Sequence, residues 1–257
     1  MDLGIAGKTA FVAASTGGLG LAVARALAAE GARVAITGRR RELAEAIAAE
    51  LPGAIAVEAD LSTPDGIAAA VDRTEAELGP IDILVLNGPG PKPGAAAALS
   101  VDDLASAFES LVRPHHALVS RILPGMRERR WGRVLAIGSS GVVAPLPNLA
   151  VSNTGRAALA AYLKTLAAEV ALDAVTVNLL LPGRIGTDRV AELDQAAAKR
   201  RGVTVTDIER ESLKTIPARR YGNPEEFGAA AAFLCSAPAS YITGVALRCD
   251  GGLIRSL

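Results

Sequence analysis

Ala13-Ala14-Ser15-Thr16-Gly17-Gly18-Leu19-Gly20 joins a short apolar run, residues 9–14, to an alanine-rich segment with helical periodicity. Glycines at such a junction let the backbone turn sharply and approach a pyrophosphate, whose charge then meets the positive end of the following helix. Tight packing alone also explains a glycine turn, but its position after the first strand favours a dinucleotide site. A typical turn of this kind opens with glycine, so we expect Ala14 to be tolerated only if its φ is negative.

Short β-branched or aliphatic runs alternate with longer helical patterns along the whole chain. Several runs are almost wholly apolar, which is typical of strands covered by helices on both faces. Right-handed crossovers between such strands predict an α/β fold, a Rossmann-type doubly wound parallel sheet of about seven strands flanked by helices. No linker or repeat divides residues 1–257, so we expect a single domain. The predicted strands are Thr9–Ala14, Arg33–Thr37, Ala54–Glu58, Ile81–Leu86, Arg133–Ile137, Val175–Leu181 and Val245–Cys249.

Three helix starts are marked by capping residues. Ser100-Val101-Asp102-Asp103 and Asn223-Pro224-Glu225-Glu226 have the pattern of a capping box, the second with proline at the first helical position. Thr63-Pro64-Asp65 offers a similar cap. We therefore expect helices to begin directly after Thr63, Ser100 and Asn223.

The composition argues against several classes of partner. Lysine plus arginine number 27 and aspartate plus glutamate number 27, so no net field favours nucleic acid or a membrane surface. Charge interrupts the apolar stretches well before ~20 residues, which argues against a membrane span. Cys235 and Cys249 are isolated thiols without metal-ligand spacing, which indicates core residues in a reducing compartment and no metal site. With no signal-peptide pattern at the N-terminus, we expect a soluble cytoplasmic protein.

The end of the second predicted strand bears on the choice of cofactor. An acidic residue there would accept hydrogen bonds from the ribose of NAD and repel a 2′-phosphate. This chain instead has Thr37-Gly38-Arg39-Arg40. The guanidinium of Arg39, with Ser15 and Thr16 nearby, suits a 2′-phosphate through charge-assisted hydrogen bonds. We therefore expect NADP(H) to be preferred over NAD(H); a solvated basic turn is the alternative interpretation.

Several short motifs follow one another in a characteristic order along nearly the whole chain. They are the glycine turn, Asp60-Leu61, Asn87-Gly88-Pro89-Gly90, Gly132-Arg133, Ser139, Val177-Asn178, Pro182-Gly183, Ile242-Thr243-Gly244 and Asp250-Gly251-Gly252. No single motif is specific, but their order and spacing together are. In these motifs and their order, the chain resembles the short-chain dehydrogenase/reductase family, in particular its 3-oxoacyl-[acyl-carrier-protein] reductase-like branch.

The resemblance implies which residues surround the cofactor. It implies that Asp60 and Leu61 face adenine, and that Asn87 shapes the end of the fourth strand beside the cofactor. It also implies that residues 182–187 wrap the nicotinamide, with the Ile185 backbone and the Thr187 hydroxyl near the carboxamide. The expected cofactor contacts are Ser15, Thr16, Gly18, Leu19, Gly20, Arg39, Asp60, Leu61, Asn87, Gly88, Arg156, Pro182, Gly183, Ile185 and Thr187.

The same resemblance implies a divergent catalytic set. The family uses an asparagine, a serine, a tyrosine and a lysine; the lysine binds the nicotinamide ribose and lowers the pKa of the tyrosine, which passes a proton to the substrate oxygen. Here the asparagine position falls on Leu111 and the serine position on Ser139. Ser152 stands where the tyrosine belongs, and Arg156 takes the lysine position one helical turn later.

Ser152 and Arg156 can still contact the same ligand, because side chains one turn apart project from the same helix face. Arg156 can hold ribose hydroxyls and polarise an oxyanion, but it stays protonated and cannot be the acid. A serine hydroxyl is also a poor acid near neutral pH. We therefore expect Ser139, Ser152 and Arg156 to be the catalytic residues, acting as oxygen-binding groups with bound water in the proton relay.

Other titratable side chains have structural roles as their first interpretation. Tyr162 follows Ser152 on the same predicted helix but points elsewhere around it. Tyr221 sits in a loop that could fold over a substrate, and Tyr241 precedes the last strand; packing is the first interpretation for both. His115 and His116 follow a proline within a helix register, where a structural or interface role is expected.

Residues 184–220 resemble the substrate-covering lid of the family, with helical stretches Asp188–Arg201 and Thr206–Thr215. The segment is more charged than a bare crossover requires, which supports the hypothesis of an anionic substrate such as a carboxylate or a phosphopantetheine thioester. The possible anion contacts are Arg184, Arg189, Lys214, Arg219 and Arg220.

Two functional interpretations stay open. The first is an NADP(H)-dependent oxidoreductase that interconverts a carbonyl and an alcohol, resembling a 3-oxoacyl reductase but with a non-standard proton donor. The second is a catalytically degenerate or non-redox relative that keeps the nucleotide-binding pocket. The resemblance also implies a homotetramer or homodimer, because the family usually pairs the helices equivalent to Leu99–Arg130 and Ser152–Leu172.

Overall fold

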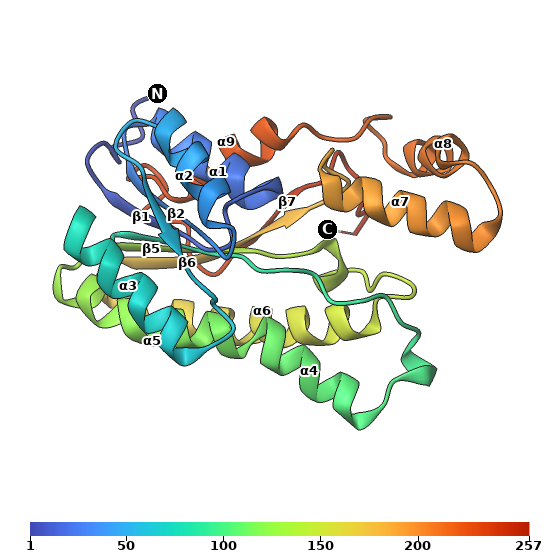
Figure 1. Ribbon diagram of the computed structural model, residues 1–257, viewed down its shortest axis with the longest axis horizontal. Helices are drawn as coiled ribbons and strands as arrows, with labels where there is room; N and C mark the ends of the chain where they lie inside the picture. Colours follow the sequence, from blue (N-terminus) through green and yellow to red (C-terminus); the bar gives the residue numbers. More distant parts are fainter. Residues whose placement is uncertain (257) are drawn as a thin grey trace.

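The computed structural model describes residues 1–256, which fold around a parallel β-sheet (Figure 1). Its seven strands stand in the order β3-β2-β1-β4-β5-β6-β7, and all neighbouring pairs are parallel. The chain therefore winds outward from β1 to β3, crosses back to β4 and winds outward again, which confirms the predicted doubly wound fold. The strands are β1 (Thr9–Val12), β2 (Arg33–Gly38), β3 (Ile55–Glu58), β4 (Ile83–Leu86), β5 (Gly132–Ile137), β6 (Val175–Pro182) and β7 (Ala246–Cys249).

Helices cover both faces of this sheet, with α1, α2 and α9 on one side and α3, α4, α5 and α6 on the other (Figure 1). The layer helices are α1 (Gly18–Ala29), α2 (Arg41–Glu50), α3 (Pro64–Leu78), α4 (Val101–Leu111), α5 (Arg113–Glu128), α6 (Ala150–Val170) and α9 (Pro224–Leu234). Two further helices, α7 (Asp188–Arg201) and α8 (Val205–Thr215), follow β6 and extend beyond the layered body (Figure 1). Short 3-10 helices occupy Ala96–Ala98, Ser140–Val142 and Ala171–Asp173.

Each face of the sheet buries its own apolar core, because successive side chains of a strand point to opposite faces. In β4, Leu84 packs into the core beneath α3, α5 and α6, whereas Val85 packs into the core beneath α1 and α9. Phe11 and Phe227 are fully buried in the first and second core respectively. The two-sided burial explains why the central strands are almost wholly apolar.

The capping residues fix where three helices begin. The Ser100 hydroxyl accepts a hydrogen bond from the Asp103 N–H at 3.1 Å, while the Asp103 carboxylate accepts from the Ser100 N–H at 2.9 Å. The Asn223 N–H donates to the Glu226 carboxylate at 2.8 Å, and Thr63 accepts from the N–H of Gly66 at 3.1 Å. All three predicted starts are confirmed, because the helices begin at Pro64, Val101 and Pro224. Thr63 and Ser100 each supply a partner for an otherwise unpaired helical N–H.

The strand ends differ slightly from the prediction. β1 ends at Val12, not Ala14, because the backbone leaves the extended conformation at the glycine turn.

No helix in the stretch from residue 1 to 256 has both the length and the apolar character needed to cross a bilayer. Cys235 and Cys249 are both free thiols, the first buried and the second half-buried.

Candidate active site

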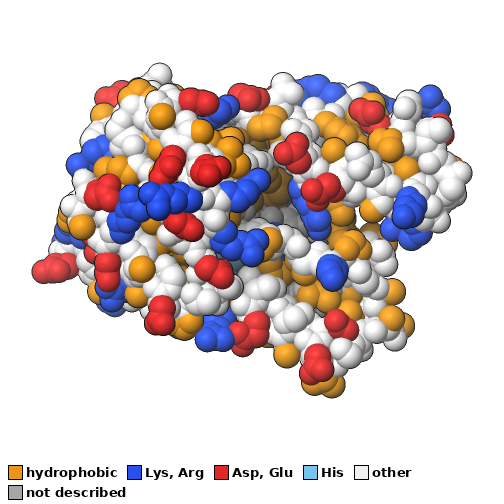
Figure 2. Space-filling model, in the orientation of Figure 1, with side chains coloured by type: hydrophobic (Ala, Val, Ile, Leu, Met, Phe, Trp, Pro, Cys, Tyr) orange, Lys and Arg blue, Asp and Glu red, His pale blue; other side chains and the backbone are white. Residues whose placement is uncertain are grey.

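The carboxyl ends of β1, β4 and β5 meet at one edge of the sheet, where the strand order reverses between β1 and β4. In open α/β sheets, ligands bind in the crevice at this point, because neighbouring connections leave in opposite directions. Figure 2 shows the molecule hollowed between the layered body and the arm that carries α7 and α8, with lysine and arginine side chains around the hollow.

The glycine turn brings helix α1 against the end of the sheet. A Cβ placed on Gly20 would lie 2.6 Å from Asn87 Nδ2 and 2.7 Å from the Ala14 carbonyl, so no larger residue fits without displacement. Gly18 has φ +56°, and a Cβ there would meet no atom within 4 Å. The backbone of the first helical turn is therefore open on the side where a pyrophosphate would meet the helix N-terminus.

Ala14 contradicts the expected backbone conformation, because its φ is +48° and not negative. The left-handed conformation disfavours a residue with a Cβ, so the turn stores local strain. Two contacts hold it in place: the Ala14 N–H donates to the Thr37 hydroxyl at 3.1 Å, and Asn87 Nδ2 donates to the Ala14 carbonyl at 3.1 Å. Alanine is retained by hydrogen bonds from β2 and β4 on its two sides.

Ser15 does not offer its hydroxyl to a ligand. The side chain is fully buried, donates to the Val12 carbonyl at 2.8 Å and accepts from the Thr37 N–H at 2.9 Å. Thr37 also donates to the Val12 carbonyl at 2.8 Å. Ser15 therefore joins β1 to β2. Because its hydroxyl already has both partners, we correct the expectation that this hydroxyl contributes to binding a 2′-phosphate.

Two arginines directly follow the end of β2. Arg40 Nη2 donates to the Thr16 hydroxyl at 3.0 Å and to its carbonyl at 3.2 Å, so this guanidinium covers the glycine turn. Arg39 is exposed, and its charge is one cause that lowers the pKa of Asp60; hydrogen bonds from Ser62 are the larger cause. Arg40 was not among the expected cofactor contacts, although the Arg39-Arg40 doublet in the sequence was the signal for both.

Asn87 and Gly88 follow β4 and line the same edge. Besides its bond to Ala14, the Asn87 amide packs against Gly20, so it ties β4 to the glycine turn. A Cβ on Gly88 would lie 3.7 Å from Cε1 and 3.9 Å from Nε2 of His115, a buried residue in the first turn of α5. His115 is thereby brought to the site, which the sequence analysis did not predict.

Ser139 lies in a loop that Asn153 braces from the first turn of α6: a Cβ on Gly141 would lie 2.5 Å from Asn153 Oδ1 and 3.3 Å from Ser139 Oγ. Ser139 Oγ accepts from the Gly141 N–H at 3.0 Å. Asn153 donates to the Leu146 carbonyl at 2.9 Å and accepts from the Leu146 N–H at 3.3 Å, which fixes the loop between β5 and α6. Ser152 is half-buried, and its hydroxyl forms no hydrogen bond within residues 1–256. The brace by Asn153 was missed, because an asparagine in a helix gives no sign of its distant partner.

Arg156 points from α6 toward the end of β5. Its Nη1 donates to the Ile137 carbonyl at 2.9 Å and to the Gly138 carbonyl at 3.2 Å. Burial lowers the pKa of the guanidinium from its ordinary value of 12.5, and the group remains charged. The charge is thus held beside Ser139, at the edge where the strands end.

Pro182, Gly183, Ile185 and Thr187 lie at and just after the end of β6, and their place around a nicotinamide stays a prediction. A Cβ on Gly183 would lie 2.6 Å from the Asp250 Cα, so glycine is needed for this approach. Ile185 is buried and pairs with Gly222 through an isolated parallel bridge. The Thr187 hydroxyl donates only a long hydrogen bond, 3.4 Å, to the Ile185 carbonyl, which leaves its lone pairs available.

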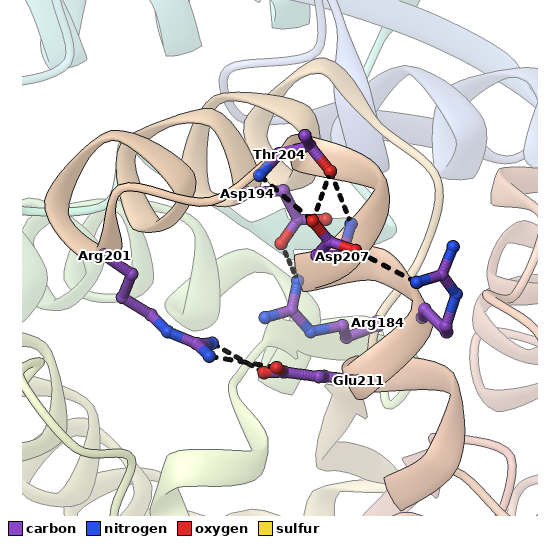
Figure 3. A network of polar contacts seen from close by, with 7 residues as sticks. Arg184, Asp194, Arg201, Thr204, Asp207 and Glu211 are labelled. Carbon is purple, nitrogen blue, oxygen red and sulfur yellow. Dashed lines mark hydrogen bonds and ion pairs between the residues drawn. The ribbon is translucent and has the colours of Figure 1, made fainter.

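The lid is held together by ion pairs, several of which Figure 3 shows. Arg184 pairs with the buried carboxylate of Asp194, which also accepts from the Tyr221 hydroxyl at 2.9 Å. Arg201 contacts Glu211 through two hydrogen bonds of 2.6 and 3.0 Å, which join the end of α7 to α8. Thr204 caps α8 by exchanging hydrogen bonds with Asp207. The lid therefore has its own polar framework.

This framework engages three of the five cations that were expected to contact an anionic substrate, while the hypothesis of an anionic substrate stays a prediction. Arg184 is paired with Asp194, and Arg220 contacts Glu226 through hydrogen bonds of 2.7 and 2.6 Å that contribute to lowering the pKa of Glu226 to about 2. Arg189 pairs with Glu192 and donates to the Pro91 carbonyl at 3.3 Å. A substrate carboxylate would have to compete with these partners.

The remaining aromatic side chains lie away from the strand ends. The Tyr162 hydroxyl is 3.0 Å from His116 Nδ1, on the face of α6 that meets α5, as the helical angle predicted. Tyr241 is fully exposed. A cavity of about 390 Å³ opens beside the start of α6; it is lined in part by Pro91, Lys92, Leu99, Asp103, Ser106 and Val151. Val151 directly precedes Ser152 in the chain, whereas Ser139, Ser152 and Arg156 themselves are not in the lining of this cavity.

Comparisons with known proteins agree with this geometry. Residues 13–254 match the family model described as "Enoyl-(Acyl carrier protein) reductase". The NADPH-dependent reductase BacG of Bacillus subtilis is 30% identical over 97% of this chain and 99% of its own length. The 3-oxoacyl-[acyl-carrier-protein] reductase FabG of Aquifex aeolicus is 33% identical over 98% of this chain and 100% of its own.

A solved structure covers the chain from end to end. The L-sorbose reductase of Gluconobacter frateurii, in complex with NADPH and L-sorbose, superposes with a TM-score of 0.93 at 32% identity, over 100% of both chains. The parallel sheet and the match over residues 13–254 therefore point to the same family. The chain belongs to the short-chain dehydrogenase/reductase family.

Proposed function

We propose that the protein is an NADP(H)-dependent oxidoreductase that interconverts a carbonyl and an alcohol. The observation that carries this proposal is the open glycine turn flanked by Arg39 and Arg40, neither of which forms an ion pair among residues 1–256. A 2′-phosphate between them would replace water with charge-assisted hydrogen bonds. The NADPH named for the reductase of Bacillus subtilis and for the sorbose reductase supports the same cofactor.

The residues present fit a dinucleotide. A Cβ on Gly18 would meet no atom within 4 Å, so the first turn of α1 has room for a pyrophosphate, while Gly20 and Gly183 allow the close packing that holds the turn and the loop after β6 in place. NADPH, when bound, would supply the hydride, and the protein would supply binding and orientation. Arg156 would hold hydroxyl groups on the nicotinamide side, while Asn87 keeps the glycine turn in register with β4.

The protein's own part in the reaction is to hold the substrate oxygen and admit a proton to it. Ser139 and Ser152 would bind the substrate oxygen, and the charge of Arg156 would stabilise negative charge that develops on it. Because neither serine is a strong acid, the proton comes from water through the free hydroxyl of Ser152. In alcohol oxidation the same hydroxyls would pass the proton outward.

The substrate binds next to Ser152, in the cavity lined partly by Val151, Leu99 and Pro91. These apolar side chains favour a substrate with an apolar chain, and Lys92 in the same lining is compatible with an acyl thioester.

The cellular location and the assembly of the protein belong to the same proposal. Two free thiols are consistent with a cytoplasmic location. A homotetramer or homodimer through α4, α5 and α6 is supported by the exposed apolar side chains of Val101, Leu104 and Phe108 on α4.

Binding and turnover are measured separately to test this proposal. We expect NADPH to bind more tightly than NADH, and NADPH to be oxidised in the presence of 3-oxoacyl thioesters or ketones. Arg156→Ala should abolish that oxidation, whereas Arg113→Ala, a matched change on the exposed end of α5, should not. Tight NADPH binding without turnover on any substrate would favour the alternative, a degenerate nucleotide-binding protein. Absence of nucleotide binding would contradict both.

A further inference from the structure

Helix α6 holds the segment that carries Ser139 at two points, one on each side of that residue. On the side toward β5, Arg156 Nη1 donates to the two backbone carbonyls directly before Ser139, at 2.9 and 3.2 Å. On the other side, Asn153 exchanges hydrogen bonds with the backbone of Leu146. Arg156 already has a part in the proposed reaction, whereas Asn153 has none.

The amide of Asn153 uses both of its ends on Leu146. Nδ2 donates to the Leu146 carbonyl at 2.9 Å, and Oδ1 accepts from the Leu146 N–H at 3.3 Å. An amide carries a donor and an acceptor side by side, so an alanine at this position could make neither bond and an aspartate only one. The loop between β5 and α6 is therefore closed onto the first turn of α6 by a single side chain.

The same amide oxygen is packed against Gly141, inside this loop. A Cβ added to Gly141 would lie 2.5 Å from Asn153 Oδ1 and 3.3 Å from Ser139 Oγ. Gly141 is buried and does not have a positive φ. Position 141 therefore lacks space for a methyl group, whereas its backbone conformation is open to any residue. Asn153 and Gly141 fit one another as a pair.

Gly141 in turn decides how the hydroxyl of Ser139 can be used. The Gly141 N–H donates to Ser139 Oγ at 3.0 Å, and the hydroxyl proton of Ser139 has no acceptor within residues 1–256. A serine hydroxyl has one proton and two lone pairs. With one lone pair engaged by the backbone, Ser139 is oriented to donate, as a substrate oxygen that gains negative charge requires.

We propose that Asn153 is a positioning residue of the reaction. By holding Leu146 and Gly141 against α6, it keeps the Ser139 hydroxyl turned as a hydrogen-bond donor to the substrate oxygen. Asn153 acts through Gly141 and does not itself contact the substrate. The inference rests on the proposed function, because the part of Ser139 in the reaction belongs to that proposal.

Steady-state kinetics of Asn153→Ala test this role. We expect kcat for NADPH-dependent reduction to fall roughly 10-fold, less than the about 100-fold that a displacement of 1 Å can cost. The KM of the carbonyl substrate and the Kd of NADPH should change less than about 2-fold, because the orientation of Ser139 matters in the transition state. Asn153→Asp keeps the volume and one of the two bonds and should lose less. Thr154→Ala, at the exposed next position of α6, is the control.

A double variant tests whether Asn153 acts through Gly141. Gly141→Ala alone should lower kcat, since its methyl group must displace Asn153 or Ser139. In the Asn153→Ala background the amide oxygen is gone, so the same change should cost less than about 2-fold more. Hydrogen exchange needs no turnover and reports on the bond to Ser139 directly. Exchange of the Gly141 N–H should be roughly 10-fold faster in Asn153→Ala and unchanged in Thr154→Ala.

Several outcomes would overturn the role of Asn153 while the proposed function stands. They are an unchanged kcat per bound NADPH in Asn153→Ala, exchange at Gly141 as slow as in the wild-type protein, and additive losses in the double variant. A fall in stability with kcat intact would show a structural role only. If Asn153→Ala does not fold, Asn153→Asp gives the same comparison. A wild-type protein that binds NADPH but reduces no carbonyl substrate would overturn both proposals.

Discussion

Arg40 closes over the glycine turn by donating from Nη2 to both the hydroxyl and the carbonyl of Thr16, at 3.0 and 3.2 Å. This contact is possible because residue 38 is glycine: a Cβ there would lie 2.9 Å from Cγ2 of Thr16. The end of β2 and the turn after β1 are thereby locked together. The positive charge that would receive a 2′-phosphate is shared between Arg40, which is fixed, and Arg39, which is exposed.

Arg39→Asp should invert the cofactor preference. The carboxylate would repel a 2′-phosphate and accept hydrogen bonds from the ribose of NADH. We expect the Kd for NADPH to rise roughly 10- to 100-fold, the value of one charge-assisted contact plus repulsion, while NADH binds equally well or better. Fluorescence titration with both nucleotides measures the ratio. Arg41→Ala, which removes a neighbouring guanidinium paired with Glu45, is the control and should leave the ratio unchanged.

Gly20→Ala should destabilise the fold. The added methyl would lie 2.6 Å from Asn87 Nδ2 and 2.7 Å from the Ala14 carbonyl, so α1 or the end of β1 must shift. Overpacking of this kind costs about 1–3 kcal/mol. Urea unfolding checks the prediction, with Gly17→Ala as control: Gly17 is extended, and its Cβ would have 3.6 Å to Arg40 Nη2. Equal stability of both variants would show that the close approach at Gly20 is not limiting.

Most of the fold could be predicted, because it depends on patterns that repeat along the chain. Strand positions follow from apolar runs, and the lid helices were predicted to within one residue at Asp188–Arg201 and Val205–Thr215. The local backbone was not predictable in the same way. Ala14 adopts positive φ because β2 and β4 supply hydrogen bonds from residues far along the chain, and no local sequence rule contains those bonds.

The same limit applies to the candidate site. Its position follows from strand ends that the sequence marks with glycine, but the direction of each side chain depends on what packs around it. The Ser15 hydroxyl turned inward because Val12 and Thr37 offered partners, and His115 reached the site because Gly88 leaves room for its ring. The roles of Ser139, Ser152 and Arg156 stay predictions.

Acid should destabilise the protein through His115. Its folded-state pKa is about 4, below the ordinary 6.5, so between these values the unfolded chain binds the extra proton. The contribution is fully present above about pH 6.5 and is lost as the pH falls toward 4; a shift of this size corresponds to about 3 kcal/mol. Urea midpoints measured across this range should fall less steeply for His115→Leu than for the wild-type protein or His116→Leu. Parallel curves would contradict the low pKa.

The lid should loosen when its buried carboxylate loses partners. Tyr221→Phe removes one hydrogen bond to Asp194 and should cost about 1 kcal/mol, whereas Arg184→Met leaves that carboxylate buried without a cation and should cost more. Limited proteolysis between residues 188 and 215 reports on this local opening. Arg210→Met, which removes an exposed pair with Asp207, should change the cleavage rate little. Equal sensitivity of all three variants would mean that the Arg184–Asp194 pair does not hold the lid.

Restoring the family's proton donor is the most direct test of what the site still does. In Ser152→Tyr with Arg156→Lys, the phenol would stand one helical turn before an ammonium that can approach the Ile137 and Gly138 carbonyls as Arg156 does now. If the cavity beside Val151 still admits a carbonyl substrate, reduction by NADPH should rise, roughly 100-fold for a positioned acid. Each single variant should gain less, because a tyrosine beside arginine or a lysine beside serine completes only half of the pair. A folded double variant that binds NADPH yet gains no activity would show that the substrate side has also diverged, since the cofactor and the acid would then both be present without a substrate between them.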